Sequence, residues 1–499
     1  MIRELFNKGI KNYTYTVIAL VITTLISFVG TPIIIRHIGE SEYGIYQLIL
    51  QYLAYLSIWD FGLSTSSCSL LNKAHTSGDR KAIINTIKFI LRQYLKIVPL
   101  ILFALMAIIY LIYNSVMKDQ PTEYMHALLI MAACGIYIPL NVFRDHLRSS
   151  EKFYIISKLS TYQLSLMTCL NIYFSYKGYG LLGLAYSYFL LNFLFVAFIF
   201  LMSYREIVKL PILNIEFELS GVKLWNTNFH SFFQNIFGQL SFATDTIILS
   251  FFQPTSAITN FVTNQRLAKL VDTFLSNIGN SFWSSISQTS EDQGQKQRAI
   301  DLINKVFLIL AFPTICALGI NNKSFIHLWL GSKFYISDLF TWISFSNFLI
   351  FGILSFWGWL FVGQQKIQMK TKTIAIAGFI NITASIILTK TIGIIGPVLG
   401  TFLSFYFFYI WHIKAVMEAE LNINVSDFLK RFIFLIGIAS LIAYFQSSFQ
   451  FIQVTSWGGL ILNLGLNYLL FLITFLFIVF KRDDLDLAIK YLKKSFQKE

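Results

Sequence analysis

The chain has 499 residues, of which 56% are hydrophobic, 17% aromatic and only 13% charged. A soluble domain usually contains about 25% charged residues, so this composition excludes a water-exposed surface of normal size. The net charge of +14 does not indicate nucleic-acid binding, because the basic residues lie in loops between long apolar segments, a pattern typical of a multi-pass membrane protein.

A helix needs about 20 apolar residues to cross a bilayer, and the sequence predicts about fourteen such spans in an all-α, polytopic membrane protein. In chain order they are 13–35, 43–66, 97–115, 124–143, 154–176, 180–204, 229–252, 257–286, 306–325, 338–361, 373–390, 394–416, 432–450 and 457–480. The eighth is polar, and the third and fourth are short, so we expect twelve to fourteen spans.

The distribution of basic residues gives a topology for these spans. With the N-terminus placed inside, the inner segments carry 31 Lys and Arg residues and the outer loops carry six. Cytoplasmic loops are enriched in Lys and Arg. We therefore expect a bacterial inner-membrane protein with both termini in the cytoplasm and with loops too short to hold a soluble catalytic domain.

The sequence also contains an internal repeat. At a shift of 214, residues 22–67 meet 236–281 without a gap, and ten of these 46 pairs are identical. A repeat of six helices predicts two parallel lobes, and transporters built from repeats bind substrate between them. The expected parts are an N-terminal lobe (1–204), a cytoplasmic linker (205–228), a C-terminal lobe (229–416), two extra helices (431–480) and a basic tail (481–499).

The polar eighth span carries Arg266, Lys269 and Asp272 at steps of three, with Gln265 beside them. Each such charge costs roughly 2.5–3.5 kcal/mol at the centre of a membrane helix, so this face is predicted to line a polar cavity. Arg266 and Lys269 suit an anionic group such as a pyrophosphate. An internal ion pair with Asp272 that only locks the helix is the alternative.

The second span, which is the repeat partner of the eighth, has amide and aromatic side chains in place of the charges. These are Gln47, Gln51, Tyr52 and Tyr55. Such groups suit sugar rings, which have polar edges and apolar faces. These four residues and Gln265 of the eighth span are therefore candidate sugar contacts. Packing between helices explains the same residues equally well.

Two further acids lie within predicted spans, Asp60 and Asp245. Together with Asp272 they are candidates for ion pairing or for binding a coupling ion, either a proton or sodium. The sequence contains no Walker A, HExxH or GxSxG motif. We therefore expect no enzymatic activity, no cofactor and no bound metal.

Several short motifs resemble those of Wzx-type flippases for O-antigen and capsule repeat units. They are Arg36 to Tyr46 (RHIGESEYGIY), Asp60 to Leu63, Gln239 to Leu249, and Leu328 to Phe334. The plan of six, six and two helices is similar to the wider multidrug/oligosaccharidyl-lipid/polysaccharide exporter superfamily. Related lipid II flippases carry arginines in the first helix, which here has none within 13–35; this favours the O-unit branch.

The resemblance implies a substrate and partners. The substrate would be an undecaprenyl-pyrophosphate-linked oligosaccharide, moved from the inner to the outer leaflet of the bilayer by ion-coupled alternating access. A polymerase and a chain-length regulator of the same pathway would be partners. The alternatives are a multidrug or small-solute antiporter of the same superfamily and, from another class, a membrane polysaccharide polymerase or glycosyltransferase.

Overall fold

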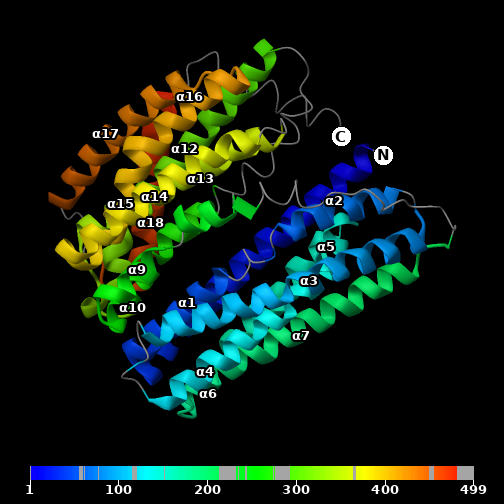
Figure 1. Ribbon diagram of the computed structural model, residues 1–499. Helices are drawn as coiled ribbons and strands as arrows, with labels where there is room; N and C mark the ends of the chain where they lie inside the picture. The colour runs from blue at the N-terminus through cyan, green and yellow to red at the C-terminus, as the bar shows by residue number, and fades with distance from the viewer. Residues whose placement is uncertain are drawn as a thin grey trace. The chain divides into compact units, whose positions relative to one another are not determined.

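The computed structural model describes most of the chain. The described residues are 2–55, 60, 62–76, 78–114, 118, 121–150, 152–212, 232–233, 235–241, 244–273, 275, 293–363, 367–448 and 454–479. Within them the protein is built from helices and short connections, with no strand (Figure 1). The predicted tail 481–499 and most of the predicted linker 205–228 lie outside them.

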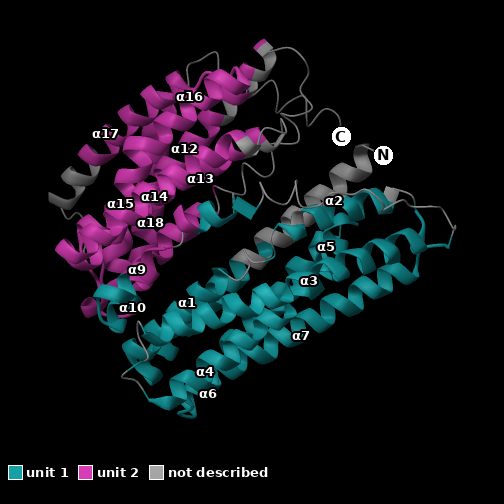
Figure 2. Ribbon diagram, in the orientation of Figure 1, with its two compact units in different colours: residues 1–239, 249–259 teal, residues 240–248, 260–499 magenta. Residues whose placement is uncertain are grey.

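The chain divides into two compact units (Figure 2). Unit 1 contains residues 1–239 and 249–259, and unit 2 contains residues 240–248 and 260–499. Both units are entirely helical in the part of the chain described. The lobe boundaries at 204 and 229 remain predictions.

Unit 1 is formed mainly by seven α-helices. They are α1 (Ile2–Tyr55), α2 (Leu63–Thr76), α3 (Arg80–Ile112), α4 (Thr122–Ala132), α5 (Asn141–Ser149), α6 (Phe153–Tyr176) and α7 (Gly180–Val208). The first two predicted spans meet within α1 at Gly39, whose φ of 88° is non-helical. The predicted fourth span is divided, because a 3₁₀ segment at Ala133–Leu140 containing Pro139 separates α4 from α5.

Helix α3 shows how the sequence determines these elements. Asp79 caps its first turn by accepting a hydrogen bond from the Lys81 backbone N–H at 3.1 Å. Its inward side chains recur at steps of three and four, and its opposite side is exposed and apolar. The buried set includes Ile83, Ile87, Ile90, Tyr94, Ile97 and Ile101, and the exposed set includes Leu95, Leu102, Phe103, Met106 and Tyr110. Two apolar faces predict one side packed on protein and one on lipid.

Unit 2 contains most of the remaining helices. They are α12 (Gln293–Trp329), α13 (Asp338–Gly363), α14 (Ile367–Ile392), α15 (Gly396–Ser404), α16 (Ile410–Leu421), α17 (Ser426–Ser448) and α18 (Trp457–Val479). Two short helices, α9 (Asp245–Phe252) and α10 (Thr255–Asn264), each contain a boundary between the units. The boundary in α9 follows residue 248, and that in α10 follows residue 259. A π-helical turn at Phe405–Tyr409 joins α15 to α16.

Close packing of α14 on α15 depends on glycine. A Cβ at Gly400 would lie 2.6 Å from the backbone nitrogen of Ser385, and one at Gly396 would overlap the backbone of Thr389. Small residues at such positions let membrane helices approach closely, which increases van der Waals contact between them.

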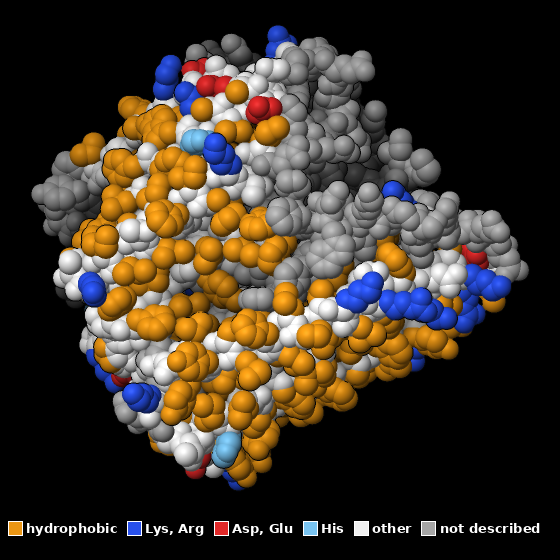
Figure 3. Space-filling view, viewed as in Figure 1, with side chains coloured by type: hydrophobic (Ala, Val, Ile, Leu, Met, Phe, Trp, Pro, Cys, Tyr) orange, Lys and Arg blue, Asp and Glu red, His pale blue; other side chains and the backbone are white. Residues whose placement is uncertain are grey.

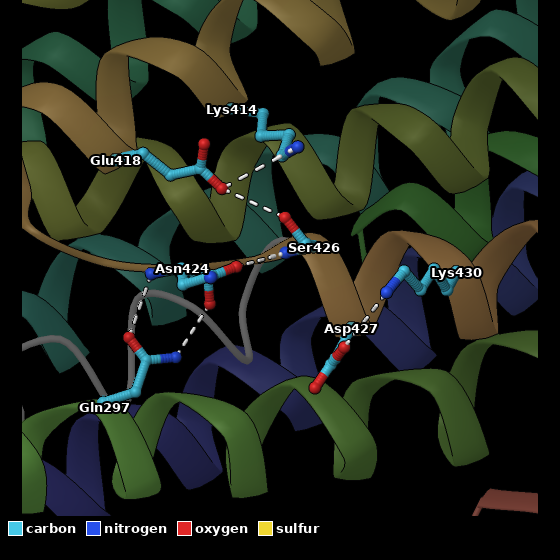
Figure 4. Close-up of polar contacts among 7 residues, drawn as sticks. All are labelled: Gln297, Lys414, Glu418, Asn424, Ser426, Asp427 and Lys430. Atoms are coloured by element: carbon cyan, nitrogen blue, oxygen red, sulfur yellow. Dashed lines mark hydrogen bonds and ion pairs between the residues drawn. The ribbon is translucent and has the colours of Figure 1, made fainter.

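The connection between α16 and α17 is fixed by polar contacts (Figure 4). The amide of Gln297 donates to the carbonyl oxygen of Asn424 at 2.7 Å and accepts from its N–H at 3.0 Å. Asn424 accepts from the Ser426 N–H at 2.8 Å, and the Ser426 hydroxyl donates to Glu418. The start of α17 is thereby attached to the first turns of α12.

The surface of the units is that of a membrane protein. Eight helices in the described part are long and apolar enough to cross a bilayer, and apolar side chains form broad areas of the face seen in Figure 3. Large side chains such as Phe477 (83% exposed) and Phe379 (73% exposed) would face water in a soluble protein. The chain is therefore a multi-pass α-helical membrane protein; the count of fourteen spans stays a prediction.

Candidate functional site

The charged segment of the eighth predicted span is a separate helix over residues 266–273, which follows a turn at Gln265. Its apolar face is buried in unit 2 through Leu267, Ala268 and Val271. On the other sides, Lys269 is exposed and Arg266 and Asp272 are half-buried. The helix is thus amphipathic, as the sequence predicts. Gln265 differs from the prediction, because it is buried in the turn instead of lying in the exposed row.

Lys269 interacts with both of the acids that the sequence offers as candidates for ion pairing in this part of the chain. It interacts electrostatically with Arg266 and with two carboxylates, Asp272 on the same helix and Asp245 at the start of α9. The sequence argument set two cations against one acid. With Asp245 included, the formal charges of this group balance, so an anionic ligand would compete with Asp245 for Lys269.

Asp245 belongs to a polar cluster inside unit 2. The hydroxyl of Thr401 lies 3.3 Å from Oδ1 of Asp245 and 3.1 Å from Oδ1 of Asn381, and it can donate to either. Ser385 also donates to Asn381 Oδ1 at 3.0 Å. A carboxylate, an amide oxygen and two hydroxyls form the type of oxygen-rich group that binds a proton or a hard cation.

The helix beside this cluster is interrupted. The sequence predicts one continuous helix over 229–252, whereas residues 235–241 and Asp245–Phe252 are helical and Thr244 is not. The side-chain amide of Asn381 donates to the carbonyl oxygen of Ser241 at 2.7 Å, so it satisfies an acceptor at the end of the first segment. Broken membrane helices with exposed backbone groups are common at transporter ion sites.

The predicted sugar-contacting residues are divided between two environments in unit 1. Gln47, Gln51 and Tyr55, spaced four residues apart, are half-buried and lie along one side of α1. Tyr52 is buried. The hydroxyl of Tyr55 donates to the backbone oxygen of Gln239 at 3.3 Å.

Asp60 has a clear structural contact. Its two oxygens accept hydrogen bonds from the N–H groups of Gly62 (2.8 Å) and Ser64 (3.4 Å), which cap the start of α2. The hydroxyl of Ser64 in turn donates to Asp145 at 2.8 Å. Sequence reasoning missed Asp145 because it placed residues 144–158 in a cytoplasmic loop, where a carboxylate attracts no attention.

Two of the sequence motifs have structural roles. In the first, Glu42 accepts hydrogen bonds from the Tyr124 hydroxyl at 2.9 Å and from the Leu181 N–H at 3.0 Å, so it connects α1 to the starts of α4 and α7. In the motif from Leu328 to Phe334, the carbonyl oxygen of Phe334 accepts a hydrogen bond from the side-chain amide of Asn264 at 2.7 Å. That bond attaches the 3₁₀ segment Ser332–Phe334, which follows α12, to α10.

Unit 2 also contains an apolar cavity of about 470 Å³, lined by residues of α12, α13, α15 and α17. Its polar lining is limited to Ser346 and Ser440, and Phe312, Trp342 and Phe402 are among its walls. A cavity of this size and polarity suits an apolar chain.

Long apolar helices with exposed apolar side chains define a polytopic α-helical membrane protein. The chain matches the family model "Polysaccharide biosynthesis protein" over residues 10–290. It therefore belongs to the polysaccharide biosynthesis protein family. None of the curated proteins compared with the chain matches it.

Solved structures with this fold are transporters. One is "Lipid II flippase MurJ, inward closed conformation", with a TM-score of 0.70 and 17% identity, covering 93% of this chain and 99% of that one. Another is an inward-facing multidrug resistance MATE family transporter of the MOP superfamily, with a TM-score of 0.55 and 14% identity, covering 80% and 98%. A third, MATE in the bent conformation, has a TM-score of 0.56 and 15% identity, covering 83% and 96%. At these identities the likeness shows the fold alone.

Proposed function

We propose that the protein moves an undecaprenyl-pyrophosphate-linked oligosaccharide repeat unit across the bacterial inner membrane, for O-antigen or capsule synthesis. Arg266 and Lys269 bind the anionic pyrophosphate, and Gln47, Gln51 and Tyr55 contact the sugars. The termini lie in the cytoplasm, and transport requires no cofactor and forms no covalent intermediate.

The observation that carries this proposal is the helix at residues 266–273. It buries one apolar face and leaves Lys269 exposed, with Arg266 half-buried beside it. Fixed cations along a membrane-embedded helix are expensive and almost always face a partner or a polar cavity. Membership of a polysaccharide biosynthesis family supports a glycan-bearing substrate, and the apolar cavity of unit 2 accommodates part of a lipid chain.

Asp245 supplies the coupling to an ion in this scheme. Because Lys269 interacts with Asp245, a proton or cation bound at Asp245 frees the charge of Lys269 for the pyrophosphate. Substrate and ion then favour each other's binding, as linkage requires. Thr401, Asn381 and Ser385 provide the other oxygens around the ion.

The test is glycan display by variants in a strain lacking the gene. Arg266→Ala and Lys269→Ala are each expected to abolish surface polysaccharide while the protein remains in the membrane at its normal level. Lys430→Ala is the matched control, since Lys430 is an exposed cation 3.8 Å from Asp427 on α17. Full display by the Arg266→Ala/Lys269→Ala double variant would refute the proposal.

The second candidate function is export of drugs or other small solutes, which the structural likeness to MATE transporters favours. Organic cations need acidic sites, and the Asp245 cluster offers one carboxylate to them. Drug susceptibility of the deletion strain separates the two functions. Increased susceptibility with unchanged surface glycan would favour the antiporter. A membrane polymerase or glycosyltransferase would instead leave lipid-linked repeat units on the outer leaflet when deleted.

A further inference from the structure

A second buried polar cluster lies in unit 1 and has no role in the function proposed above. It is formed by α2, α3 and α5, with Asp145 and Tyr94 fully buried and Asp60 8% exposed. Arg144 is half-buried beside Asp145. Burying carboxylates is costly unless their charge and their hydrogen-bonding atoms are compensated, so each of these atoms must be accounted for.

The hydrogen bonds of the two acids are unequal. Both oxygens of Asp60 accept from backbone N–H groups at the start of α2. Asp145 receives one bond, from the Ser64 hydroxyl to its Oδ1 at 2.8 Å. Among the described residues, its Oδ2 is buried without a hydrogen-bond partner.

The hydroxyl of Tyr94 is a second buried polar group of this cluster. It is buried and, within the described part of the chain, has no hydrogen-bond partner, although it interacts electrostatically with both Asp60 and Asp145. Tyr94 of α3 is therefore close enough to both acids to interact with their charges. Unsatisfied groups of this kind in native proteins mark bound water, bound ions or titrating sites.

The positive charges around Asp145 do not fully compensate the negative charges of the cluster. Asp60 and Arg144 act on it from within the cluster, and Arg148, three residues further along α5, acts from an exposed position. Cys68 of α2 contacts the backbone oxygen of Asp145 at 3.9 Å. Two carboxylates against one half-buried guanidinium leave one negative charge, because water screens the exposed Arg148.

The neighbouring histidines belong to a separate contact. His146 follows Asp145 on α5, so the two side chains point in different directions. Its Nδ1 lies 2.9 Å from the Ser203 hydroxyl, and its ring packs against His75 with centroids 4.9 Å apart. Burial lowers the pKa of His75, with Lys152 acting in the same direction. A neutral His75 therefore adds no positive charge near the acids.

The remaining charge suits a proton better than a metal cation. Hard cations such as Ca²⁺ and Mg²⁺ take six or more oxygen ligands. The unpartnered oxygens described here are Asp145 Oδ2, the Tyr94 hydroxyl and, one helical turn after Ser64, the Ser67 hydroxyl. A proton needs only one carboxylate oxygen and one acceptor.

We propose that Asp145 is a proton-binding site. The proton resides on Oδ2, with the Tyr94 hydroxyl as its neighbour, and exchanges with water at the end of α5, where Arg148 is exposed and Ser64 half-buried. One proton moves between Oδ2 and water, and no other bond changes. This site is independent of Arg266, Lys269 and Asp245, and it stands whether or not the protein carries a glycan lipid.

The test is infrared difference spectroscopy of the purified protein in lipid nanodiscs between acidic and alkaline buffer. The wild type is expected to show the carbonyl stretch of a buried protonated carboxylic acid at acidic pH and to lose it at alkaline pH. Carbon-13 labelling of aspartate should shift this band in the wild type, so the result does not depend on a variant that folds. A wild type without any such band overturns the proposal.

Variants assign the band to a residue. Asp145→Asn should remove it, Tyr94→Phe should move it because the neighbouring hydroxyl is lost, and the exposed control Asp427→Asn should leave it unchanged. Asp245→Asn should leave the Asp145 band unchanged, because Asp245 belongs to unit 2 and any proton that it binds gives a separate band. Loss of the band in Asp245→Asn with retention in Asp145→Asn would place the proton at the other site and overturn the assignment. Failure of glycan display in Arg266→Ala does not affect this experiment.

Discussion

The hydroxyl oxygens of Ser41 and Thr255 lie 2.5 Å apart, and the two residues are 214 positions apart in the chain. The shift at which the sequence overlays itself is also 214, so this hydrogen bond joins equivalent positions of the internal duplication. Beside them, Thr259 donates to the backbone oxygen of Glu40 at 2.6 Å.

Gly44 allows this contact, and its replacement should destabilise unit 1. A Cβ on Gly44 would overlap the carbonyl oxygen of Thr255. Overpacking of a close contact costs about 1–3 kcal/mol, so Gly44→Ala should lower the thermal unfolding temperature in detergent. Gly437→Ala in α17 is the control, because its Cβ would meet nothing within 4 Å. Equal unfolding temperatures for both variants would contradict the close contact.

Replacing Asp245 should remove the ion dependence of ligand binding. In Asp245→Asn, Lys269 loses one of its two acidic partners, so an undecaprenyl-pyrophosphate probe should bind more tightly. The affinity of the variant should also stop responding to pH or sodium. In the wild type we expect the ion to change the affinity by about 5- to 150-fold, which is the usual size of such a coupling. Binding to the purified protein measures both effects. A variant with wild-type ion dependence would exclude Asp245 as the coupling site.

Glu42 should contribute more to stability than a surface carboxylate. Glu42→Ala leaves the Tyr124 hydroxyl and the Leu181 N–H without their acceptor, which costs roughly 1–3 kcal/mol. Glu42→Gln retains an acceptor oxygen and should lose less. A double-mutant cycle with Tyr124→Phe isolates the hydroxyl bond. Additivity of the two single changes would mean that this bond contributes nothing.

Asp301, on α12 before its membrane-spanning part, gives a pH-dependent prediction. Burial raises its pKa, although Gln297 donates a hydrogen bond to it at 2.9 Å. The folded state thus favours the protonated acid, and this contribution is lost as pH rises through the raised pKa. Asp301→Asn should therefore be more stable than the wild type at neutral pH, and the difference should shrink on acidification. Thermal unfolding across a pH series measures it; a constant difference would contradict the burial argument.

Sequence reasoning predicted the features that depend on residues close together in the chain. The apolar run at 97–115, the polar face carrying Arg266 and Lys269, and the family membership follow from residues close together in the chain. The turns of α3 before residue 97 were not predicted, since helix α3 begins at Arg80. It did not find Thr401 as a neighbour of Asp245, because 156 positions separate them. The interruption near Thr244 was missed for a related reason, since the Asn381 amide that satisfies Ser241 comes from a distant helix.

The same limit applies to the acids of unit 1. Periodicity identified Asp60 as a lone intramembrane carboxylate, yet its partners are the N–H groups of the next helix start. Asp145 was missed because the predicted fourth span ends at residue 143, whereas the apolar helical stretch of the structure continues to Ser149 and includes Asp145. Tertiary packing, which composition does not encode, decides such positions.

The π-helical turn at Phe405–Tyr409 sets the rotational register of α16, which continues directly from it. Each residue of an α-helix turns the chain by about 100°, so deleting a single residue here would restore regular hydrogen bonding and rotate α16 by that angle. The buried side chains Ile413 and Met417 would then point outward, and Trp411, now half exposed, would turn inward. Homologues with one residue fewer at this point must therefore distribute their apolar side chains differently along α16.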